Sequence, residues 1–354
     1  MPDVSFHVDQ EIYHFFKEKV SGGCHPSEFS IPSHLEPILQ NISIPSPIAG
    51  RWASHAILQV LADHLPQLVG GSADLSSSDG TYLEKYELIQ AGRFEGRNIK
   101  YGVREFGMAC IAAGMAQTGS IIPFIGTFLG FVDYMRNAIR MTSLMRLKVI
   151  YQLTHDSIFI GPDGPTHQPI EQLASLRAIP GLLVLRPADA NEVKMSWLAA
   201  LLHEGPTALI LSRQPLAELP ARSYTEGVGR GAYIVRQETT EEVDYLLIAT
   251  GSEVHLALAV AEELGPSARV VSMPSWELFE KQPVIYKQAI LQGKIKISIE
   301  AGVDQGWHKY IGADGIAVSL TWFGESAAAS DLAKRFGYTK EAIVHKIRTT
   351  QCER

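Results

Sequence analysis

The sequence contains few cysteines: only Cys24, Cys110 and Cys352 occur among its 354 residues. They form neither a C-x-x-C pair nor an even disulfide framework, which favours a reducing compartment. No uninterrupted apolar run reaches the ~18 residues that a membrane-spanning helix requires. The amino-terminal run MPDVSFHVDQEIYHFF has Asp and Glu where a signal peptide carries Lys or Arg before an apolar core. We therefore expect a cytoplasmic protein with no membrane partner.

The sequence also lacks any run of Lys or Arg, and its formal net charge is −7. Such a chain has no electrostatic footprint for nucleic acid or for an anionic membrane, so we expect neither as a partner. A phosphorylated substrate would need a few cations placed locally. The balance of 46% hydrophobic and 19% charged residues is typical of a globular protein. Because the length exceeds the ~100–200 residues of an average domain, we expect two domains.

Residues 1–50 differ in composition from the rest of the chain. They hold a short amphipathic run at residues 11–20 and are then rich in proline, which interrupts both helices and central strands. We interpret this segment as an extended arm or linker without a core of its own.

From Arg51 onward, short apolar runs alternate with segments of helical periodicity. Continuous apolar runs such as SIIPF, KVIYQL and TALIL are typical of a buried parallel sheet with helical crossovers. This predicts one α/β domain over residues 51–221. The same alternation resumes after the polar stretch ARSYTEGVGRG and predicts a second α/β domain over residues 229–354. Each domain is expected to be a mostly parallel sheet flanked by helices.

A single carboxylate, Glu105, stands directly before a helical run of small apolar residues. Four aromatic side chains follow it: Phe124, Phe128, Phe131 and Tyr134. A carboxylate enclosed by apolar and aromatic groups has a raised pKa and can donate a proton to a ring nitrogen near neutral pH. This arrangement predicts a site for a flat heterocycle. The alternative is that Glu105 only favours the helix dipole and that the aromatic side chains belong to the core.

Ligands bind beyond the carboxyl ends of parallel strands, and three predicted strand ends are rich in polar groups. The first, GGSADLSSSDG, offers small hydroxyls and carboxylates: Asp74, Ser76, Ser77, Ser78 and Asp79. Together with free backbone N–H groups they suit a phosphate or sugar hydroxyls, although ordinary turns have the same composition.

The second strand end carries His155, Asp156, Asp163 and His167 on one loop. The spacing of the two histidines fits neither the H-x-x-x-H nor the H-x-H pattern of metal sites. Acid–base catalysis or hydrogen bonding to a polyhydroxylated substrate is favoured instead, because histidine titrates nearest to neutral pH. Incidental loop histidines are the alternative.

The third strand end places Arg213 directly after the run TALILS, and Arg51 opens the first predicted helix. The planar guanidinium group binds phosphate with two parallel hydrogen bonds, so both residues are candidate phosphate ligands. A surface ion pair is the ordinary alternative for each.

Several long segments resemble the transketolases, in the order of that family: GGSADL, YGVREFGM, TFLGFVDYMRNAIR, DGPTHQPIEQLASLR, GPTALILSRQ, IATGSEV and TWFGESA. Transketolases use thiamine diphosphate to transfer a two-carbon ketol unit from a ketose phosphate to an aldose phosphate. The resemblance implies that the first domain is the pyrimidine-binding domain and the second the transketolase C-terminal domain. It also implies sugar-phosphate substrates and a homodimer. The run FHVDQEIYHFF resembles the linker between the family's first two domains.

The resemblance implies roles for individual residues. Glu105 matches the glutamate that hydrogen-bonds N1′ of the cofactor's aminopyrimidine and so assists removal of the thiazolium C2 proton. Phe131 matches the ring that stacks on the pyrimidine, and Phe128 and Tyr134 flank Phe131. Leu75 matches the contact near the thiazolium, and its neighbour Asp74 is assigned to the same part of the cofactor site. The ligands of the substrate phosphate are matched by Arg51, Ser78, His155 and Arg213. Asp163 and His167 match groups that bind substrate hydroxyls, and His167 is also expected to take part in catalysis.

Two features depart from the family pattern. The family binds the diphosphate and a divalent metal, Mg²⁺ or Ca²⁺, through an N-terminal domain with a Gly-Asp-Gly motif, and the sequence has no such motif. We therefore expect no metal site in this chain, half of each active site, and no activity without an N-terminal domain. That domain belongs either to the same longer chain, which the linker-like segment favours, or to a separate subunit. In addition, SSSDGTYLEKYE stands where many relatives have a Pro-Ser-Asn run.

Three alternatives remain open. The β subunit of the 2-oxo-acid dehydrogenases pairs the same two domains, although the DGPTHQP loop and the arginine of ALILSRQ fit transketolase better. Dihydroxyacetone synthase transfers the same unit to formaldehyde. From another class, the chain could be a catalytically silent dimerising module.

Overall fold

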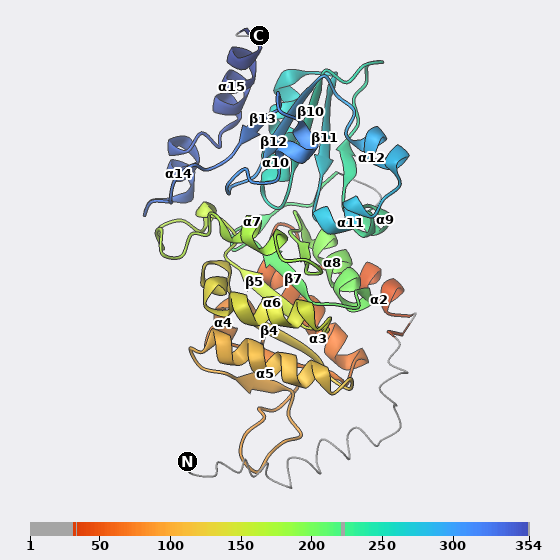
Figure 1. The fold of residues 1–354 in the computed structure, drawn as a ribbon, viewed down its shortest axis with the longest axis vertical. Coiled ribbons are helices and arrows are strands. Elements are labelled where there is room, and N and C mark those ends of the chain that lie inside the picture. Colours follow the sequence, from red (N-terminus) through yellow and green to blue (C-terminus); the bar gives the residue numbers. More distant parts are fainter. Residues whose placement is uncertain (1–30, 33, 221–223, 353–354) are drawn as a thin grey trace.

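The computed structural model describes residues 31–32, 34–220 and 224–352. They form two α/β domains that follow one another along the chain, the first coloured orange to green and the second teal to blue in Figure 1. The predicted fold class is confirmed. The boundaries predicted at residues 221 and 229 stay predictions.

The first domain is built on a six-stranded sheet in which all neighbouring strands run parallel. In spatial order its strands are β3 (Asn98–Lys100), β2 (Leu68–Ser72), β4 (Ile122–Phe128), β5 (Ile150–Thr154), β7 (Thr207–Leu211) and β6 (Leu183–Leu185). In register, Phe128 at the end of β4 pairs with Thr154 at the end of β5, and Thr154 pairs with Leu211 at the end of β7. The residues that follow these three strands therefore begin at one edge of the sheet.

Helices cover both faces of this sheet. One face contacts α3 (Gly50–His64) and α8 (Ala190–Leu202), and the other contacts α5 (Glu105–Gln117), η1 (Leu129–Met135), α6 (Arg136–Leu144) and α7 (Gln172–Arg177). Successive residues of β7 alternate between the two faces. Leu209 belongs to the buried cluster on the side of α3 and α8, and Ile210 belongs to the buried cluster on the side of α5 and α6. The shorter elements are α2 (Leu35–Asn41), β1 (Ile48–Ala49), α4 (Ser76–Asp79), η2 (Ile158–Ile160) and β8 (Pro215–Leu216).

The second domain has a five-stranded mixed sheet. In spatial order its strands are β13 (Ile316–Val318), β12 (Ile295–Ile299), β10 (Tyr245–Ala249), β11 (Ala268–Ser272) and β9 (Tyr233–Arg236). Only β9 runs antiparallel to its neighbour. The helices are α9 (Tyr224–Gly229), α10 (Glu253–Leu264), α11 (Trp276–Glu280), α12 (Val284–Ile290), α13 (His308–Ile311), α14 (Ala329–Arg335) and α15 (Lys340–Cys352).

One hydrophobic core extends through both domains. The same cluster of buried side chains contains Leu209 of β7, Val193 of α8 and Leu247 of β10. An ion pair also joins the domains, because Arg177 donates two hydrogen bonds of 2.8 Å to the carboxylate of Glu300. Burial of apolar surface therefore stabilises the two domains together.

Part of the predicted arm is helical rather than extended. Helix α2 lies against α8 and buries Leu35 and Leu39, which are one turn apart. Pro37 falls in the first turn of α2, where a missing N–H group breaks no hydrogen bond within the helix. The amphipathic run at residues 11–20 lies outside the described residues. None of the helices that the structure describes is long and apolar enough to cross a membrane.

Candidate functional site

The candidate site lies at the sheet edge where β4, β5 and β7 end. Two arginines meet there because the start of α3 is attached to the residue after β7. The backbone N–H of Gly50 donates to Oγ of Ser212 at 3.0 Å, and the N–H of Arg51 donates to the carbonyl of Ser212 at 3.3 Å. Since Arg213 follows Ser212 directly, the two arginine side chains originate side by side. The sequence identified each arginine as a candidate phosphate ligand but did not indicate that the two lie together.

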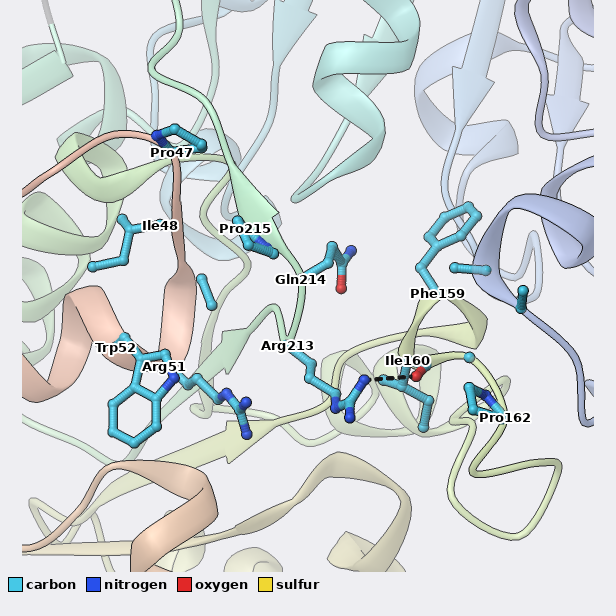
Figure 2. A pocket seen from close by; sticks show the side chains of 14 residues that line it. Pro47, Ile48, Arg51, Trp52, Phe159, Ile160, Pro162, Arg213, Gln214 and Pro215 are labelled. Atoms are coloured by element: carbon cyan, nitrogen blue, oxygen red, sulfur yellow. Dashed lines mark hydrogen bonds between the residues drawn. The ribbon is translucent and has the colours of Figure 1, made fainter.

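Both guanidinium groups extend into one open pocket of about 730 Å³ (Figure 2). Nη1 of Arg51 donates to the carbonyl of Ser78 at 2.7 Å, and Nη1 of Arg213 donates to the carbonyl of Ile160 at 3.0 Å. The pocket is lined by Pro47, Ile48, Ala49, Arg51, Trp52, Phe159, Ile160, Gly161, Pro162, Arg213, Gln214, Pro215, Ala328 and Ala329.

The charges of this pocket favour an anion. Burial, followed by the nearby Arg213 guanidinium, lowers the pKa of Arg51 from its ordinary value, which shows that the two cations repel each other. Nε of Arg51 is buried and has no hydrogen-bond partner among the described residues. A bound phosphate would relieve the repulsion between the two guanidinium groups and accept hydrogen bonds from their unused N–H groups.

His155 is buried beside these cations. Its backbone lies in the left-handed region with φ of 60°, its ring centroid is 3.6 Å from that of Phe128, and Nδ1 is 2.9 Å from Oγ1 of Thr154. Burial, together with the charges of Arg51 and Arg213, lowers the pKa of His155 to about 3. The ring is therefore neutral at physiological pH and can donate or accept a hydrogen bond.

Three aromatic rings, which we call the aromatic shelf, lie at the end of β4 and in the segment after it: Phe128, Phe131 and Tyr134. The segment after β4 begins with the 3₁₀ helix η1. Three residues per turn align side chains at i and i+3, so successive rings lie 5.7 and 6.3 Å apart. His167 meets Phe131 edge to face at 5.2 Å. The shelf offers a flat apolar surface for a ring.

Glu105 is the first residue of α5, which lies against η1 and thus close to the aromatic shelf. The residue is only 8% exposed, yet no hydrogen bond or ion pair to its carboxylate occurs in the described part of the chain. A largely buried carboxylate without a partner is available to a ligand.

The loop after β2 contacts Arg51 and also lines a second pocket. Ser78 offers its carbonyl to Arg51, while Leu75 caps α4 and accepts the N–H of Ser78 at 2.7 Å. Asp74 is exposed, has a φ of 64°, and lines a separate pocket of about 140 Å³ together with Lys100. The structure therefore does not bring Asp74 to the pocket of the two arginines.

Asp79 belongs to the same loop and is buried. The sequence did not indicate its burial. Its carboxylate accepts hydrogen bonds from the hydroxyl of Ser72 and from both the hydroxyl and the backbone N–H of Thr81. Burial raises the pKa of Asp79 to about 6, in spite of these bonds and of the Arg51 charge. A run of Ser, Asp and Gly is typical of turns, so the sequence holds no signal of this environment.

Asp163 and His167 lie on the loop between β5 and α7. Asp163 is exposed and interacts electrostatically with Arg51, and Nδ1 of His167 is 2.9 Å from Oγ1 of Thr166. Within the described ranges, no group of three or more His, Cys, Asp or Glu residues lies close enough together to hold a metal ion.

Two family models match the chain. The transketolase pyrimidine-binding domain matches residues 46–218, and the transketolase-like C-terminal domain matches residues 231–339. The first match contains both arginines and the aromatic shelf, while Ala328 and Ala329 of the same pocket fall within the second match.

Known proteins agree with these matches. The chain is 49% identical to the transketolase of Aquifex aeolicus over 305 residues, which are 84% of this chain and 44% of that protein. The structure of transketolase from Leishmania mexicana is similar with a TM-score of 0.85 and 42% identity, over 91% of this chain and 48% of that one. The chain thus spans about half the length of the relatives it matches.

A second solved structure, described as a split gene transketolase in an inactive β4 tetramer, shares the fold. It has a TM-score of 0.71 and 23% identity, and the match covers 86% of this chain and 98% of that one. The chain therefore belongs to the transketolase family, of which it carries the pyrimidine-binding and C-terminal domains.

Proposed function

We propose that this chain supplies the pyrimidine side of a thiamine-diphosphate site, together with the phosphate-binding pocket for a ketose substrate. The reaction is transfer of a two-carbon ketol unit from a ketose phosphate to an aldose phosphate. The observation that carries the proposal is the meeting of Arg51, Arg213 and neutral His155 at the sheet edge that also bears the aromatic shelf.

The residues present fit the pyrimidine end of the cofactor. The aromatic shelf offers a flat apolar surface, on which Phe131 would stack on the ring with Phe128 and Tyr134 beside it. Glu105 has no partner in the described chain and would share a proton with N1′. When bound, thiamine diphosphate supplies the acidic thiazolium carbon that accepts the ketol unit. Leu75 and Asp74 are proposed to lie near the thiazolium.

The substrate would be held by its two ends. Arg51, Arg213 and His155 would bind the phosphate, with Ser78 positioning Arg51 through its carbonyl. The exposed carboxylate and imidazole of the β5–α7 loop, Asp163 and His167, would bind the sugar hydroxyls, and His167 would also act in proton transfer.

The diphosphate and its Mg²⁺ or Ca²⁺ are proposed to bind to an N-terminal domain outside this chain. The described residues offer no cluster of metal ligands, and the chain spans about half of its relatives. A protein of the same fold is described as an inactive β4 tetramer of a split gene transketolase. On this basis we propose that the chain has no turnover until an N-terminal transketolase domain is present.

We also propose that the chain forms a homodimer through exposed apolar side chains on and around α5 and α6. They are Val103, Phe106, Ile111, Tyr134, Met141, Leu144 and Met145. Because α5 and α6 lie against one another, these side chains form part of one surface. Exposed apolar patches of this kind mark interaction sites.

The test is complementation. The chain, thiamine diphosphate and magnesium are assayed with xylulose 5-phosphate and ribose 5-phosphate, with and without a separately produced N-terminal transketolase domain. We expect turnover only in the mixture. Turnover by the chain alone would contradict the half-site proposal, and no turnover in the mixture would favour a silent dimerising module. Pyruvate in place of xylulose 5-phosphate tests the dehydrogenase-subunit alternative, and formaldehyde in place of ribose 5-phosphate tests the dihydroxyacetone-synthase alternative.

A further inference from the structure

The loop of residues 155–168, which we call the substrate loop, is attached to the second domain at both of its ends. It carries His155, Asp163 and His167 and belongs entirely to the first domain. The attachment is specific, because it uses buried side chains with several hydrogen bonds each rather than general surface contact.

At the end of the substrate loop, the attachment is made by one buried amide. Nε2 of Gln168 donates to the carbonyl of Gly161 at 2.8 Å and to the carbonyl of Glu325 at 3.0 Å. The carbonyl of Ile158 also lies 3.4 Å from Nε2, so the two N–H groups of the amide are shared among three acceptors. Gln168 thus closes the loop on itself and joins it to the second domain. Nearby, the hydroxyl of Ser326 donates to the carbonyl of Pro162 at 2.6 Å.

Gly324 allows the second domain to come this close. A methyl group built on its α-carbon would lie 1.7 Å from Oε1 of Gln168, far inside any contact that a real carbon atom makes. The requirement for glycine comes from this approach, since the backbone of Gly324 does not have a positive φ. The segment after β13 is therefore shaped to contact the substrate loop.

At the start of the substrate loop, Asp156 is held through a buried arginine. Nε and Nη2 of Arg186 donate to Oδ2 of Asp156 at 3.1 and 2.8 Å, and the same guanidinium group donates to Glu253 and Thr250 of the second domain. All three charged side chains are almost completely buried. Separating one member of such a network from the others would leave a buried charge without its partner, which is strongly destabilising. The three side chains are therefore held in place. The residue fixed in this way is the direct neighbour of His155.

We propose that the second domain positions the substrate loop through Gln168 and the segment 324–326, and thereby contributes to the affinity for the sugar. The proposal rests on the proposed function, in which Asp163 and His167 bind substrate hydroxyls. Gln168 is a positioning residue in this scheme, and the second domain contributes to substrate binding through it.

Two substitutions in the second domain test this proposal. Ser326→Ala removes one hydrogen bond, and Gly324→Ala forces the segment away from Gln168. The matched controls are Ser330→Ala, an exposed serine in α14, and Gly229→Ala, whose added methyl group would meet nothing within 4 Å. Unchanged thermal unfolding would show that each variant is folded. If Gly324→Ala does not fold, Ser326→Ala alone tests the proposal.

The first measurement is backbone hydrogen exchange in the chain alone, read from a peptide that covers the substrate loop. The N–H groups of His167 and Gln168 donate to the carbonyl of Gly164 at 3.0 and 3.2 Å. We expect their exchange to be ~10-fold faster in both test variants and unchanged in the controls, because local opening limits exchange. Equal exchange in the test variants and the parent would overturn the proposal.

The second measurement is substrate affinity in the assembled enzyme. We expect KM to rise ~10-fold for xylulose 5-phosphate and for unphosphorylated xylulose alike, with a smaller change in kcat, because the loop binds hydroxyls and misplacement weakens orientation. Faster exchange with unchanged KM would also overturn the proposal, since the loop would then be attached for stability alone. If the parent assembly shows no turnover, the proposed function fails, and the exchange result decides the attachment by itself.

Discussion

Thr81 donates two hydrogen bonds to a single oxygen of Asp79, from its hydroxyl at 2.7 Å and from its backbone N–H at 3.1 Å. The hydroxyl of Ser72 donates to the other carboxylate oxygen. This buried carboxylate directly follows Ser78, whose carbonyl holds Arg51. The pocket of the two arginines therefore rests on a loop that is fixed from inside the protein.

Asp79→Asn should gain stability relative to the parent as the pH rises toward neutral. Burial raises the pKa of Asp79 from 3.8 to about 6, so the folded protein binds this proton more tightly than the unfolded chain does. The parent loses stability as pH rises from about 4 to about 6, and the loss is complete above that range. Asparagine has no such loss, and the variant's advantage in unfolding free energy should grow by about 1–3 kcal/mol over this range.

The measurement is urea unfolding of parent and variant at several pH values. Asp74→Asn, which removes an exposed carboxylate from the same loop at a positive φ that asparagine tolerates, is the control. A stability difference between Asp79→Asn and the parent that does not change with pH would contradict the argument.

Arg213→Ala should weaken binding of phosphorylated substrates selectively. Loss of a charge-assisted hydrogen bond to phosphate removes about 1.5–3 kcal/mol of binding energy, so KM for xylulose 5-phosphate should rise ~10- to 100-fold. KM for unphosphorylated xylulose should change little, and C2 proton exchange of the cofactor should be spared. Steady-state kinetics in the assembled enzyme test this, with the exposed Arg93→Ala as control. An equal rise for both sugars would show that Arg213 does not bind the phosphate.

Glu105→Gln should slow hydrogen–deuterium exchange at C2 of thiamine diphosphate in the assembled enzyme. Glutamine keeps the volume of the side chain but cannot share a proton with N1′, and loss of a positioned acid–base group costs ~10²–10⁴ in rate. A carboxylate that only favours the helix dipole would instead cost about 0.3–1 kcal/mol of stability and leave exchange intact. Exposed Glu95→Gln is the control. Exchange as fast as in the parent would refute the role of Glu105.

Leu144→Glu should disrupt self-association of the chain. Leu144 is 68% exposed at the end of α6, and a two-fold interface would bury it twice. Burying a leucine contributes about 1.5–3 kcal/mol, so its replacement by a charge in both copies should raise the dimer dissociation constant at least ~100-fold. Ile285→Glu, at a position 79% exposed on α12, is the control. Sedimentation that shows only ~39 kDa particles of the parent at micromolar concentration would contradict the dimer.

The sequence predicted the sheets well and the site only in part. Apolar runs such as the one in β5 directly indicate buried parallel strands. When helices cover both faces of a sheet, its strands do not alternate apolar with polar residues. Helix α2 was missed because proline counts against a helix everywhere except in its first turn. The 3₁₀ geometry of η1 was missed as well, although aromatic side chains three residues apart are compatible with it.

The contacts between distant segments could not be predicted from sequence patterns. Arg51 and Arg213 were each identified as candidate cations, but nothing local indicates that Ser212 attaches one beside the other. The same holds for Gln168, whose partner Glu325 lies in the other domain. Such pairs depend on the packing of whole elements, which periodicity does not specify.

The position of β7 between β5 and β6 bears on how the first domain is made. During synthesis, β5 and β6 emerge before residues 207–211, yet neither is paired with the other in the finished sheet. Until β7 arrives, both present an open hydrogen-bonding edge with apolar side chains on two faces, the kind of edge that associates with other chains. Completion of the sheet, and with it the attachment of Arg51 beside Arg213, must wait until the ribosome has released Ser212.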